Sequence, residues 1–380
     1  MNVNRTEWGG IHIQARYDIS DELTEINQSI DGGAFKDSSV LITGGAGFLG
    51  TWLCHVLIGQ GANVTCLDNL SSGLRENIAN LEHNPRFTFI QHDISKPITF
   101  RKKFDYVMHL ASRASPLEFE NHSLEIIRAN TIGTTNALDI ATAHEAKFLF
   151  TSTSEIYGNP GIFPTPETCN GNVSTDGIRG CYTESKRMGE TLCLAYLREY
   201  GTDVRIARIF NTYGPLMRAD GEYGRVIPRF ITQAMKGEPI TIFGDGSQTR
   251  CFCYVTDQIG GLLRLLTCNS ANGQVINIGN NREISILELA NLVKKLTYSH
   301  SKMTFSNIPD GDPLRRLPNI TKAEQFLGWR PRVQLDEGLE NFSKFFRCQN
   351  QHATSSFSPE SRVTQTHFDS NLKKSHVQTR

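Results

Sequence analysis

Apolar and polar positions follow one another along this chain in a pattern that predicts alternating strands and helices. Short apolar runs predict six strands, at residues 40–43, 62–67, 87–91, 106–110, 147–152 and 203–209. Elsewhere apolar residues recur every three or four positions, which predicts helices at residues 48–58, 123–143 and 181–200. Strands and helices that alternate at this spacing predict an α/β fold built on a doubly wound parallel sheet.

The same pattern divides the chain into four parts. Residues 1–36 are polar and form an N-terminal arm, in which residues 20–23 predict the start of a short helix. Residues 37–210 carry the alternating pattern of the sheet. Residues 211–347 hold shorter elements punctuated by Gly and Pro, which predicts a smaller interleaved C-terminal domain with segments that return to the sheet. Residues 348–380 are rich in Ser, Thr, Gln, His and Asn, which predicts a disordered tail.

Composition narrows the class of protein. The chain has 39 basic and 39 acidic residues, and this balance argues against a nucleic-acid binder, which needs an excess of Lys and Arg. No run approaches the roughly 18 apolar residues of a membrane span, and the N-terminus does not resemble a signal peptide. Nine scattered cysteines form no zinc motif, so we expect free thiols and no metal site. These features predict a cytoplasmic protein without a membrane or nucleic-acid partner.

A glycine-rich turn follows the first predicted strand. Gly44, Gly47 and Gly50 give the spacing G-x-x-G-x-x-G, a variant of the Rossmann fingerprint, in which glycines let a pyrophosphate approach the helix N-terminus. The next strand ends at Asp68, 18 residues after Gly50. A carboxylate there binds ribose hydroxyls and repels a 2′-phosphate, so the pair of features predicts NAD rather than NADP.

A second motif carries acid–base chemistry. Tyr182 and Lys186 are four residues apart, which places them on one face of the helix predicted at 181–200. An ammonium beside a phenol stabilises the phenolate, so the tyrosine can act as a base. The motif follows a strand that ends in hydroxyl residues, and a hydroxyl there lies in the crevice where open α/β sheets bind ligands.

These motifs occur in an order that resembles the extended short-chain dehydrogenases/reductases acting on nucleotide sugars. The resemblance covers about residues 37–347 and includes TGGAGFLG (43–50), LDNLSSG (67–73), HD (92–93), HLAS (109–112), NTIGT (130–134), STSEIYG (152–158), YTESK (182–186), RIFNTYGP (208–215) and GDGSQTRCF (244–252). Within this family the chain is most similar to the UDP-glucuronate decarboxylases (UDP-xylose synthases), by HLASxAS (109–115), ARIFNTYGP (207–215), GSQTRCF (246–252) and DPLRRLP (312–318).

The resemblance implies a role for each catalytic position. Thr153 is the active-site hydroxyl, and Tyr182 takes the proton from the sugar 4-hydroxyl. Lys186 lowers the pKa of Tyr182 and holds the nicotinamide ribose. Glu155 assists proton transfer around C5, and Arg250 faces the sugar carboxylate.

The resemblance also implies the binding residues. The expected NAD contacts are Gly44, Gly47, Phe48, Leu49 and Gly50 at the pyrophosphate, Asp68 and Asn69 at the ribose, Asp93 and Ile94 at the adenine, and Leu110, Ala111, Ser112, Asn130, Tyr182 and Lys186 along the cleft. The nucleotide half of the substrate is expected at Asn211, Arg225 and Arg316, since a guanidinium donates two hydrogen bonds to a diphosphate.

The implied reaction explains these residue types. Oxidation at C4 by NAD makes glucuronate a β-keto acid, whose carbonyl accepts the electrons when CO₂ leaves. Arg250 stabilises the developing enolate. Protonation at C5 and return of the hydride then give the pentose, so NAD is bound and not consumed.

Two positions separate the decarboxylases from their relatives. Ser154 stands where many glucose-nucleotide dehydratases carry an Asp that protonates the leaving 6-hydroxyl, although GDP-mannose dehydratases also have Thr-Ser-Glu here. Arg250-Cys251-Phe252 sides with the decarboxylases, because dehydratases tend to have Arg-Asp-Trp. The alternatives are a nucleotide-sugar 4,6-dehydratase or epimerase, which YTESK and RADGEYGRVIPRF (218–230) leave open, and an inactive NAD-binding scaffold.

The family commonly forms homodimers through two long helices, here the helices at 123–143 and 181–200. Met188, Leu192 and Tyr196 on the second helix are candidates for that contact, and core packing within the chain is the alternative for them.

Overall fold

A seven-stranded sheet lies at the centre of the computed structural model, which describes residues 12–13, 17–30, 33–218, 225–308 and 311–355. Its strands are β3 (Ser39–Thr43), β4 (Asn63–Asp68), β5 (Phe87–Gln91), β6 (Tyr106–His109), β7 (Lys147–Thr153), β8 (Val204–Ile209) and β13 (Val275–Ile278). They are ordered β13-β8-β7-β6-β3-β4-β5, and each neighbouring pair is parallel. The structure confirms the predicted doubly wound parallel sheet, and β13 adds a strand from the C-terminal part of the chain.

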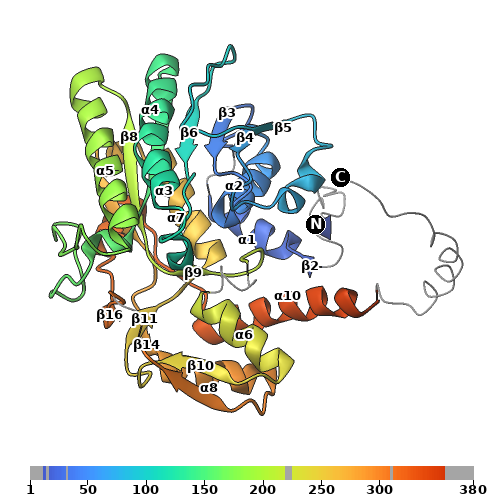
Figure 1. The fold of residues 1–380 in the computed structure, drawn as a ribbon. Helices are drawn as coiled ribbons and strands as arrows, with labels where there is room; N and C mark the ends of the chain where they lie inside the picture. Colours follow the sequence, from blue (N-terminus) through green and yellow to red (C-terminus); the bar gives the residue numbers. More distant parts are fainter. Residues whose placement is uncertain (1–11, 14–16, 31–32, 219–224, 309–310, 356–380) are drawn as a thin grey trace, which may run out of the picture.

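Both faces of this sheet are covered, which explains why its strands are apolar throughout. Along β3, Val40 and Ile42 enter one hydrophobic core, whereas Leu41 enters the other. The first core is closed by α2 (Phe48–Gly59) and α7 (Val255–Thr267), and the second by α4 (Ile132–His144) and α5 (Gly180–Tyr200). Figure 1 shows these helices around the sheet. With both faces buried, polar groups gather at the strand ends.

The single helix predicted at 123–143 is wrong, because the structure has α3 (Ser123–Asn130) and α4 with a break at Thr131. Thr131 has φ −111° and ψ −72°, outside the helical range. Its hydroxyl donates to the carbonyl of Ile127 at 2.7 Å, and Thr134 donates to Asn130 at 2.6 Å. Hydroxyls that bond to carbonyls one turn back bend helices, and a hydrophobic repeat does not show this effect.

The smaller part follows the end of β8. It contains β9 (Thr212–Tyr213), α6 (Val226–Lys236), β10 (Ile240–Phe243), β11 (Thr249–Cys251), β12 (Cys253–Tyr254), β14 (Glu283–Ser285), α8 (Ile286–Thr297), β15 (Met303–Ser306), β16 (Arg315–Arg316), α9 (Thr321–Leu327) and α10 (Leu335–Ser355). Strands β14, β11 and β16 form one small sheet, and β10 pairs with β15 in another. Figure 1 shows α6, β10 and α8 beneath the large sheet, which leaves the carboxyl ends of its strands facing this part.

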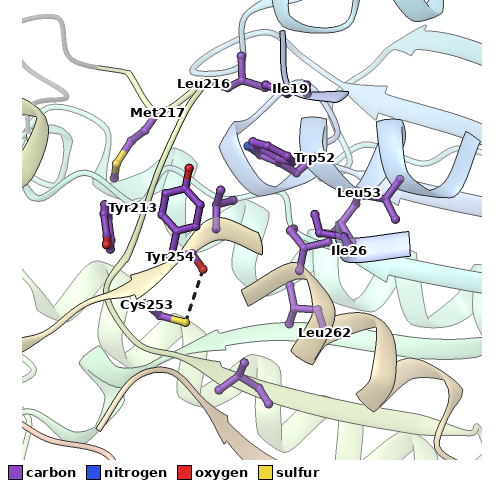
Figure 2. Packing of buried hydrophobic residues seen from close by; sticks show 14 of the residues in the cluster. Ile19, Ile26, Trp52, Leu53, Tyr213, Leu216, Met217, Cys253, Tyr254 and Leu262 are labelled. Atoms are coloured by element: carbon purple, nitrogen blue, oxygen red, sulfur yellow. Dashed lines mark hydrogen bonds between the residues drawn. The ribbon is translucent and has the colours of Figure 1, made fainter. Parts of the chain in front are cut away.

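The N-terminal segment packs into the body of the molecule. Its helix α1 (Ser20–Ser29) begins at the predicted position and lies against α2 and α7. Ile19, Leu23 and Ile26 are each at most 2% exposed. Figure 2 shows Ile19 near Trp52 of α2, and Ile26 near Leu53 of α2 and Leu262 of α7. Residues 17–30 of the predicted arm are therefore part of the main hydrophobic core.

A helix that the sequence pattern did not predict ends the described part of the chain. Helix α10 continues through Ser355, so the predicted tail starting at 348 is wrong for residues 348–355. The rest of that tail, 356–380, lies outside the described residues. The remaining short elements are β1 (His12–Ile13), β2 (Tyr17–Asp18) and the 3₁₀ helices η1 (Arg75–Asn77), η2 (Ala79–Leu81), η3 (Pro116–Glu118), η4 (Ser154–Tyr157) and η6 (Asn269–Ala271). Among the helices described here, none has the length and apolar character to cross a membrane.

The contribution of α1 to the core can be measured. We expect Leu23→Ala to lower the free energy of unfolding by about 2–5 kcal/mol, because it leaves a cavity against α2 and α7. Gln28→Ala, on the exposed side of the same helix, is the control and should change it by less than about 0.5 kcal/mol. Urea denaturation followed by circular dichroism gives both values, and equal stability of the two variants would show that α1 does not belong to the cooperative core.

Candidate active site

A cleft of about 1220 Å³ opens at the carboxyl edge of the sheet, facing the smaller part. Its lining brings together residues from distant segments of the sequence, from Gly44 to Arg316. The predicted site residues that line it are Gly44, Gly47, Phe48, Leu49, Gly50, Asp68, Asn69, Asp93, Ile94, Leu110, Ala111, Ser112, Thr153, Ser154, Glu155, Tyr182, Lys186, Asn211, Arg225, Arg250 and Arg316.

Asn130 is the predicted site residue that the structure places elsewhere. Its side chain is fully buried, and its amide donates to the Ser185 hydroxyl at 2.9 Å. This hydrogen bond joins the end of α3 to α5 behind Tyr182. Asn130 therefore supports the helix that carries the tyrosine and does not line the cleft.

The glycine turn after β3 leaves room for a dinucleotide. Gly44 has φ +72°, and a Cβ on it would lie 2.7 Å from the backbone of Ala111. A Cβ on Gly50 would collide with the Gly44 carbonyl, so these two glycines allow strand and helix to approach closely. Gly47 differs, because only the Gly44 oxygen, at 3.2 Å, would lie within 4 Å of its Cβ. A side chain at 47 would thus fill the cleft at the point where the helix begins.

The first turn of α2 supplies donors for the phosphates. Gly47 precedes the helix, and its own N–H bonds the Gly44 carbonyl at 3.1 Å. The following N–H groups of Phe48, Leu49 and Gly50 belong to the turn whose donors have no partner inside a helix. Since these residues line the cleft, the helix N-terminus fits a pyrophosphate.

Asp68 has a second function that the sequence did not reveal. One carboxylate oxygen accepts from the Ala46 N–H at 3.0 Å and the other from the Leu70 N–H at 2.8 Å. Burial raises the pKa of Asp68, and these two backbone N–H groups oppose that effect. The carboxylate therefore holds the glycine turn in shape and also faces the ribose position expected for NAD.

Tyr182 and Thr153 meet at the centre of the cleft. The tyrosine is 6% exposed, and the Thr153 hydroxyl lies close enough to lower the pKa of its phenol. Burial raises the pKa of Tyr182, whereas Arg225, Thr153 and Arg316 lower it. The net effect is opposite to the predicted lowering by Lys186, because burial outweighs the nearby cations.

Lys186 lies behind the tyrosine on α5 and is 2% exposed. Its ammonium donates to the Thr151 carbonyl at 2.8 Å and lies 4.8 Å from the centre of the Phe150 ring. Burial lowers the pKa of Lys186 to about 7. A lysine with this pKa can change its protonation near neutral pH, so the groups that keep it charged matter for the site.

Three arginines and two carboxylates form a connected cluster beside Thr153. Glu155 pairs with Arg179 at 2.9 Å and with Arg316 at 3.0 Å. Asp312 pairs with Arg179 at 3.1 Å and with Arg250 at 2.9 Å. Because these charged side chains are largely buried, each guanidinium needs an anionic partner, and the chain of pairs supplies one.

This cluster decides the protonation of Glu155. Burial alone would raise the pKa of Glu155, but Arg316 and Arg179 together hold it below its usual value. Burial lowers the pKa of Arg250, which Asp312 opposes. Glu155 is therefore a carboxylate at neutral pH, and it acts as a hydrogen-bond acceptor rather than as an acid.

The structure adds three residues that the sequence reasoning missed. Arg179 precedes Tyr182 by three positions on the same helical face, a spacing that could have revealed it. Asp312 begins the motif DPLRRLP, in which only Arg316 was singled out. Phe119 stacks on the Tyr182 ring with centroids 5.1 Å apart and planes at 17°, and nothing in its sequence surroundings points to this contact.

Two further predicted substrate residues lie at the cleft wall. Arg225 precedes α6 and donates to the Ala114 carbonyl at 3.1 Å. Asn211 donates to the Cys251 carbonyl at 3.4 Å, which ties the end of β8 to β11. Their side chains reach the cleft from the smaller part and from the sheet, respectively.

Comparison with known proteins gives consistent matches. The family model described as "NAD dependent epimerase/dehydratase family" matches residues 40–279. The chain is 45% identical over 312 residues to UDP-glucuronic acid decarboxylase 3 of Arabidopsis thaliana, a match that covers 82% of this chain and 89% of the relative.

Solved structures show the same fold. The UDP-glucuronic acid 4-epimerase of Bacillus cereus, in complex with UDP-glucuronic acid and NAD, superposes with a TM-score of 0.70 at 30% identity, covering 82% of this chain and 99% of that one. The dTDP-glucose 4,6-dehydratase of Streptomyces venezuelae, also with NAD bound, superposes with a TM-score of 0.74 at 26% identity, covering 83% and 98%.

The depressed pKa of Glu155 predicts a pH-dependent stability. We expect Glu155→Gln to lower the free energy of unfolding at pH 7 by about 1–3 kcal/mol, because two arginines lose a charged acceptor. A carboxylate with a lowered folded-state pKa stabilises the protein above its unfolded-state pKa of about 4.3, and this stabilisation is lost as the pH falls through the folded-state pKa. The difference from wild type should therefore become smaller as the pH falls below about 4.3.

Urea denaturation at pH 7 and at pH 3.5 measures this difference. Glu199→Gln, an exposed change on α5, serves as the control and should have little effect at either pH. A difference that persists unchanged at the lower pH would show that Glu155 is not ionised in the native protein.

Proposed function

The chain belongs to the NAD dependent epimerase/dehydratase family, and we propose that it decarboxylates UDP-glucuronate to UDP-xylose. Relatives named UDP-glucuronic acid decarboxylase match 82% of this chain at 42–45% identity. These relatives support the reaction class. The geometry of the cleft supports the same reaction independently.

The charge balance of the arginine cluster carries this proposal. Arg179, Arg250 and Arg316 face only Glu155 and Asp312 within the cluster, which leaves one positive charge in excess. A sugar that bears one carboxylate neutralises this excess, whereas a neutral hexose does not. Buried cations of this kind bind carboxylates strongly because water no longer screens them.

The residue beside Glu155 disfavours the dehydratase alternative. Loss of water from a hexose needs an acid that protonates the leaving hydroxyl. Ser154 occupies the adjacent position, and its hydroxyl accepts from the Arg316 guanidinium at 3.3 Å. A serine hydroxyl is a much weaker acid than a carboxylic acid, so it is a poor proton donor to a leaving hydroxyl.

The proposed cofactor is NAD, at the glycine turn and Asp68. Bound NAD supplies reversible hydride transfer at C4, which turns the substrate into a β-keto acid and activates its carboxylate for loss as CO₂. The Asp68 carboxylate, already placed by Ala46 and Leu70, accepts hydrogen bonds from the adenosine ribose. Its charge repels a 2′-phosphate, which accounts for NAD in place of NADP.

We propose that Tyr182 is the base that removes the proton of the sugar 4-hydroxyl. In its phenolate form, the Tyr182 oxygen takes this proton, and the resulting phenol returns it when the pentose forms. Lys186 stabilises the phenolate when its own ammonium is charged, and it orients itself on the Thr151 carbonyl. These roles are the ones predicted for Tyr182 and Lys186 from the family resemblance.

The arginine cluster acts at the other side of the sugar. Arg250 holds the carboxylate at C5 and stabilises the enolate that remains when CO₂ leaves. Glu155, kept ionised by Arg179 and Arg316, orients the group that protonates C5. Arg316 thus has a role beside Glu155 in addition to the diphosphate contact predicted for it, and Asn211 and Arg225 remain the proposed contacts of the nucleotide.

The reaction can be tested directly with purified protein and a panel of nucleotide sugars, followed by mass spectrometry. We expect UDP-glucuronate to lose about 44 Da, the mass of CO₂, without added reductant. UDP-glucose should remain unchanged. Loss of about 18 Da from a hexose nucleotide, with UDP-glucuronate untouched, would establish a dehydratase instead. Interconversion at C4 without any mass change would establish an epimerase.

Arg250→Ala tests the proposed carboxylate contact in the same assay. It should lower kcat for decarboxylation by about 100-fold or more, while the affinity for NAD changes less than about threefold. Arg315→Ala is the matched control, since Arg315 lies in β16, the strand paired with the Arg250 strand β11, and forms an ion pair with Glu283 near the surface. A collapse of NAD binding in Arg250→Ala would contradict the assigned role.

We also propose that the protein is a homodimer in the cytoplasm. Leu124, Ile127, Ile132 and Met188 on neighbouring helices α3, α4 and α5 are between 37% and 65% exposed. Leu192 and Tyr196, the other predicted contacts, pack against the core of their own chain. The nine cysteines are free and five are buried, as expected for thiols in a reducing compartment.

The dimer contact predicts a simple change of mass. Replacing both Leu124 and Met188 by Glu places charges in an apolar interface, so the double variant should be monomeric in light scattering at micromolar concentration. Tyr298→Glu, at a tyrosine that is 85% exposed in the smaller part, should leave the mass unchanged. A wild-type monomer, or a double variant that still dimerises, would refute this interface.

A further inference from the structure

A buried ion pair lies beneath the catalytic segment, outside the residues assigned to substrate or cofactor. Glu190 on α5 and Arg208 on β8 are joined by two hydrogen bonds, of 3.0 and 2.8 Å. The side chains are about 10% exposed, and neither residue lines the cleft. A buried bidentate pair of this kind costs desolvation, so its presence calls for a function other than stability alone.

The pair holds both ends of the segment 152–157, which carries Thr153 and Glu155. At one end, the Ser152 hydroxyl donates to Glu190. At the other end, the Arg208 guanidinium donates to the Tyr157 hydroxyl at 2.8 Å. The segment between these two points forms the 3₁₀ helix η4, which has few internal hydrogen bonds to keep its shape.

A third residue completes the hold at Tyr157. The tyrosine donates to the side-chain oxygen of Asn277 on β13 at 2.8 Å. The amide of Asn277 donates in turn to the carbonyls of Thr165 and Asn319, each at 3.0 Å. Asn319 lies three residues after Arg316, so this network also reaches the segment that carries an arginine of the substrate cluster.

The ion pair also lies next to Lys186. Glu190 follows Lys186 by one helical turn, and the two side chains anchor to consecutive residues of β7, Thr151 and Ser152. Together they fix the distance between α5, which carries Tyr182, and the strand that ends at Thr153. The geometry of the predicted base and its hydroxyl partner therefore depends on these two contacts.

The charges around Lys186 come from three elements. Burial lowers its pKa, and Cys193 and Glu190, both on α5, oppose this. Burial raises the pKa of Cys193 well above its usual value, so this thiol is neutral. His109 on β6 is neutral as well, since burial lowers its pKa to about 3, and Arg208 on β8 is engaged by Glu190. Glu190 is thus the group near Lys186 that carries a negative charge.

We propose that Glu190 and Arg208 are positioning residues for catalysis, which clamp the segment 152–157 from below and keep Lys186 in its ammonium form. This inference rests on the proposed function in one respect, namely that Tyr182 is the base. It goes beyond the cleft residues, because neither member of the pair lines the cleft. The carboxylate supplies the charge, and the guanidinium holds the carboxylate and Tyr157 in place.

Substitutions can separate the two proposed functions of the pair, which are positioning the segment 152–157 and keeping Lys186 charged. Ser152→Ala and Tyr157→Phe each release one end of the clamp without changing any charge. Each should lower kcat by about threefold to tenfold, as the loss of one hydrogen bond implies, and leave the pH profile unmoved. Glu190→Asp keeps the charge but shortens the reach, so it should behave in the same way.

Glu190→Gln removes the charge while it keeps the shape. We expect kcat/KM to fall about tenfold to a hundredfold. The alkaline limb of the pH profile should move down by about one pH unit, because Lys186 loses its proton more readily without a neighbouring carboxylate. Circular dichroism and NAD binding verify that each variant is folded.

If Glu190→Gln does not fold with Arg208 unpaired, the double variant Glu190→Gln with Arg208→Gln removes both buried charges and should show the same downward shift. The assay uses whichever nucleotide sugar the wild-type protein converts. A different substrate would overturn the proposed function and leave the clamp testable. The clamp is refuted if the folded charge-removing variant keeps the wild-type pH profile, or if Ser152→Ala moves that profile equally.

Discussion

The parallel direction of the sheet strands is the constraint on which the site depends. Because β3, β4, β6, β7 and β8 are all parallel, their carboxyl ends meet at one edge, and the turns that follow them line one cleft. Helices cover both faces with apolar side chains, so this edge is the place where polar groups can be grouped without burying them unpaired. The glycine turn, Asp68, Thr153 and Asn211 come from four different strand ends, and they are neighbours for this reason alone.

Burial is the largest influence on the pKa values of the ionisable groups in the site. It raises the pKa of Tyr182, lowers that of Lys186 to about 7, and would raise that of Glu155 if no arginine were near. Groups of opposite charge oppose these effects of burial. Arg179 and Arg316 lower the pKa of Glu155, and Glu190 raises that of Lys186. A cleft open to solvent would need fewer of these partners, since water would screen the charges. The buried ion pairs around the cleft are therefore a consequence of its depth.

The parts of the structure that the sequence predicted are those encoded by neighbours in the chain. Strands such as 40–43 show as apolar runs, and Tyr182 with Lys186 shows as a helical spacing. The sequence pattern did not predict the helix break at Thr131, because a hydroxyl that donates to a carbonyl one turn back leaves the hydrophobic pattern unchanged. The ion pair between Arg179 and Asp312 was not predicted for another reason. The two residues are 133 positions apart, and only the folded chain brings them together.

Two hydrogen-bond networks contact the segment 152–157 from opposite sides, the arginine cluster and the pair of Glu190 with Arg208. On the cleft side, Glu155 belongs to the arginine cluster, to which we assign the carboxylate of the substrate. On the other side, Ser152 and Tyr157 are held by Glu190 and Arg208, which set the geometry of Thr153 relative to Tyr182. The networks share no residue, although they are joined by a few peptide bonds. If the cluster binds the sugar carboxylate as proposed, a change among its arginines alters which sugar is accepted, while the buried pair maintains the geometry of Thr153 and Tyr182.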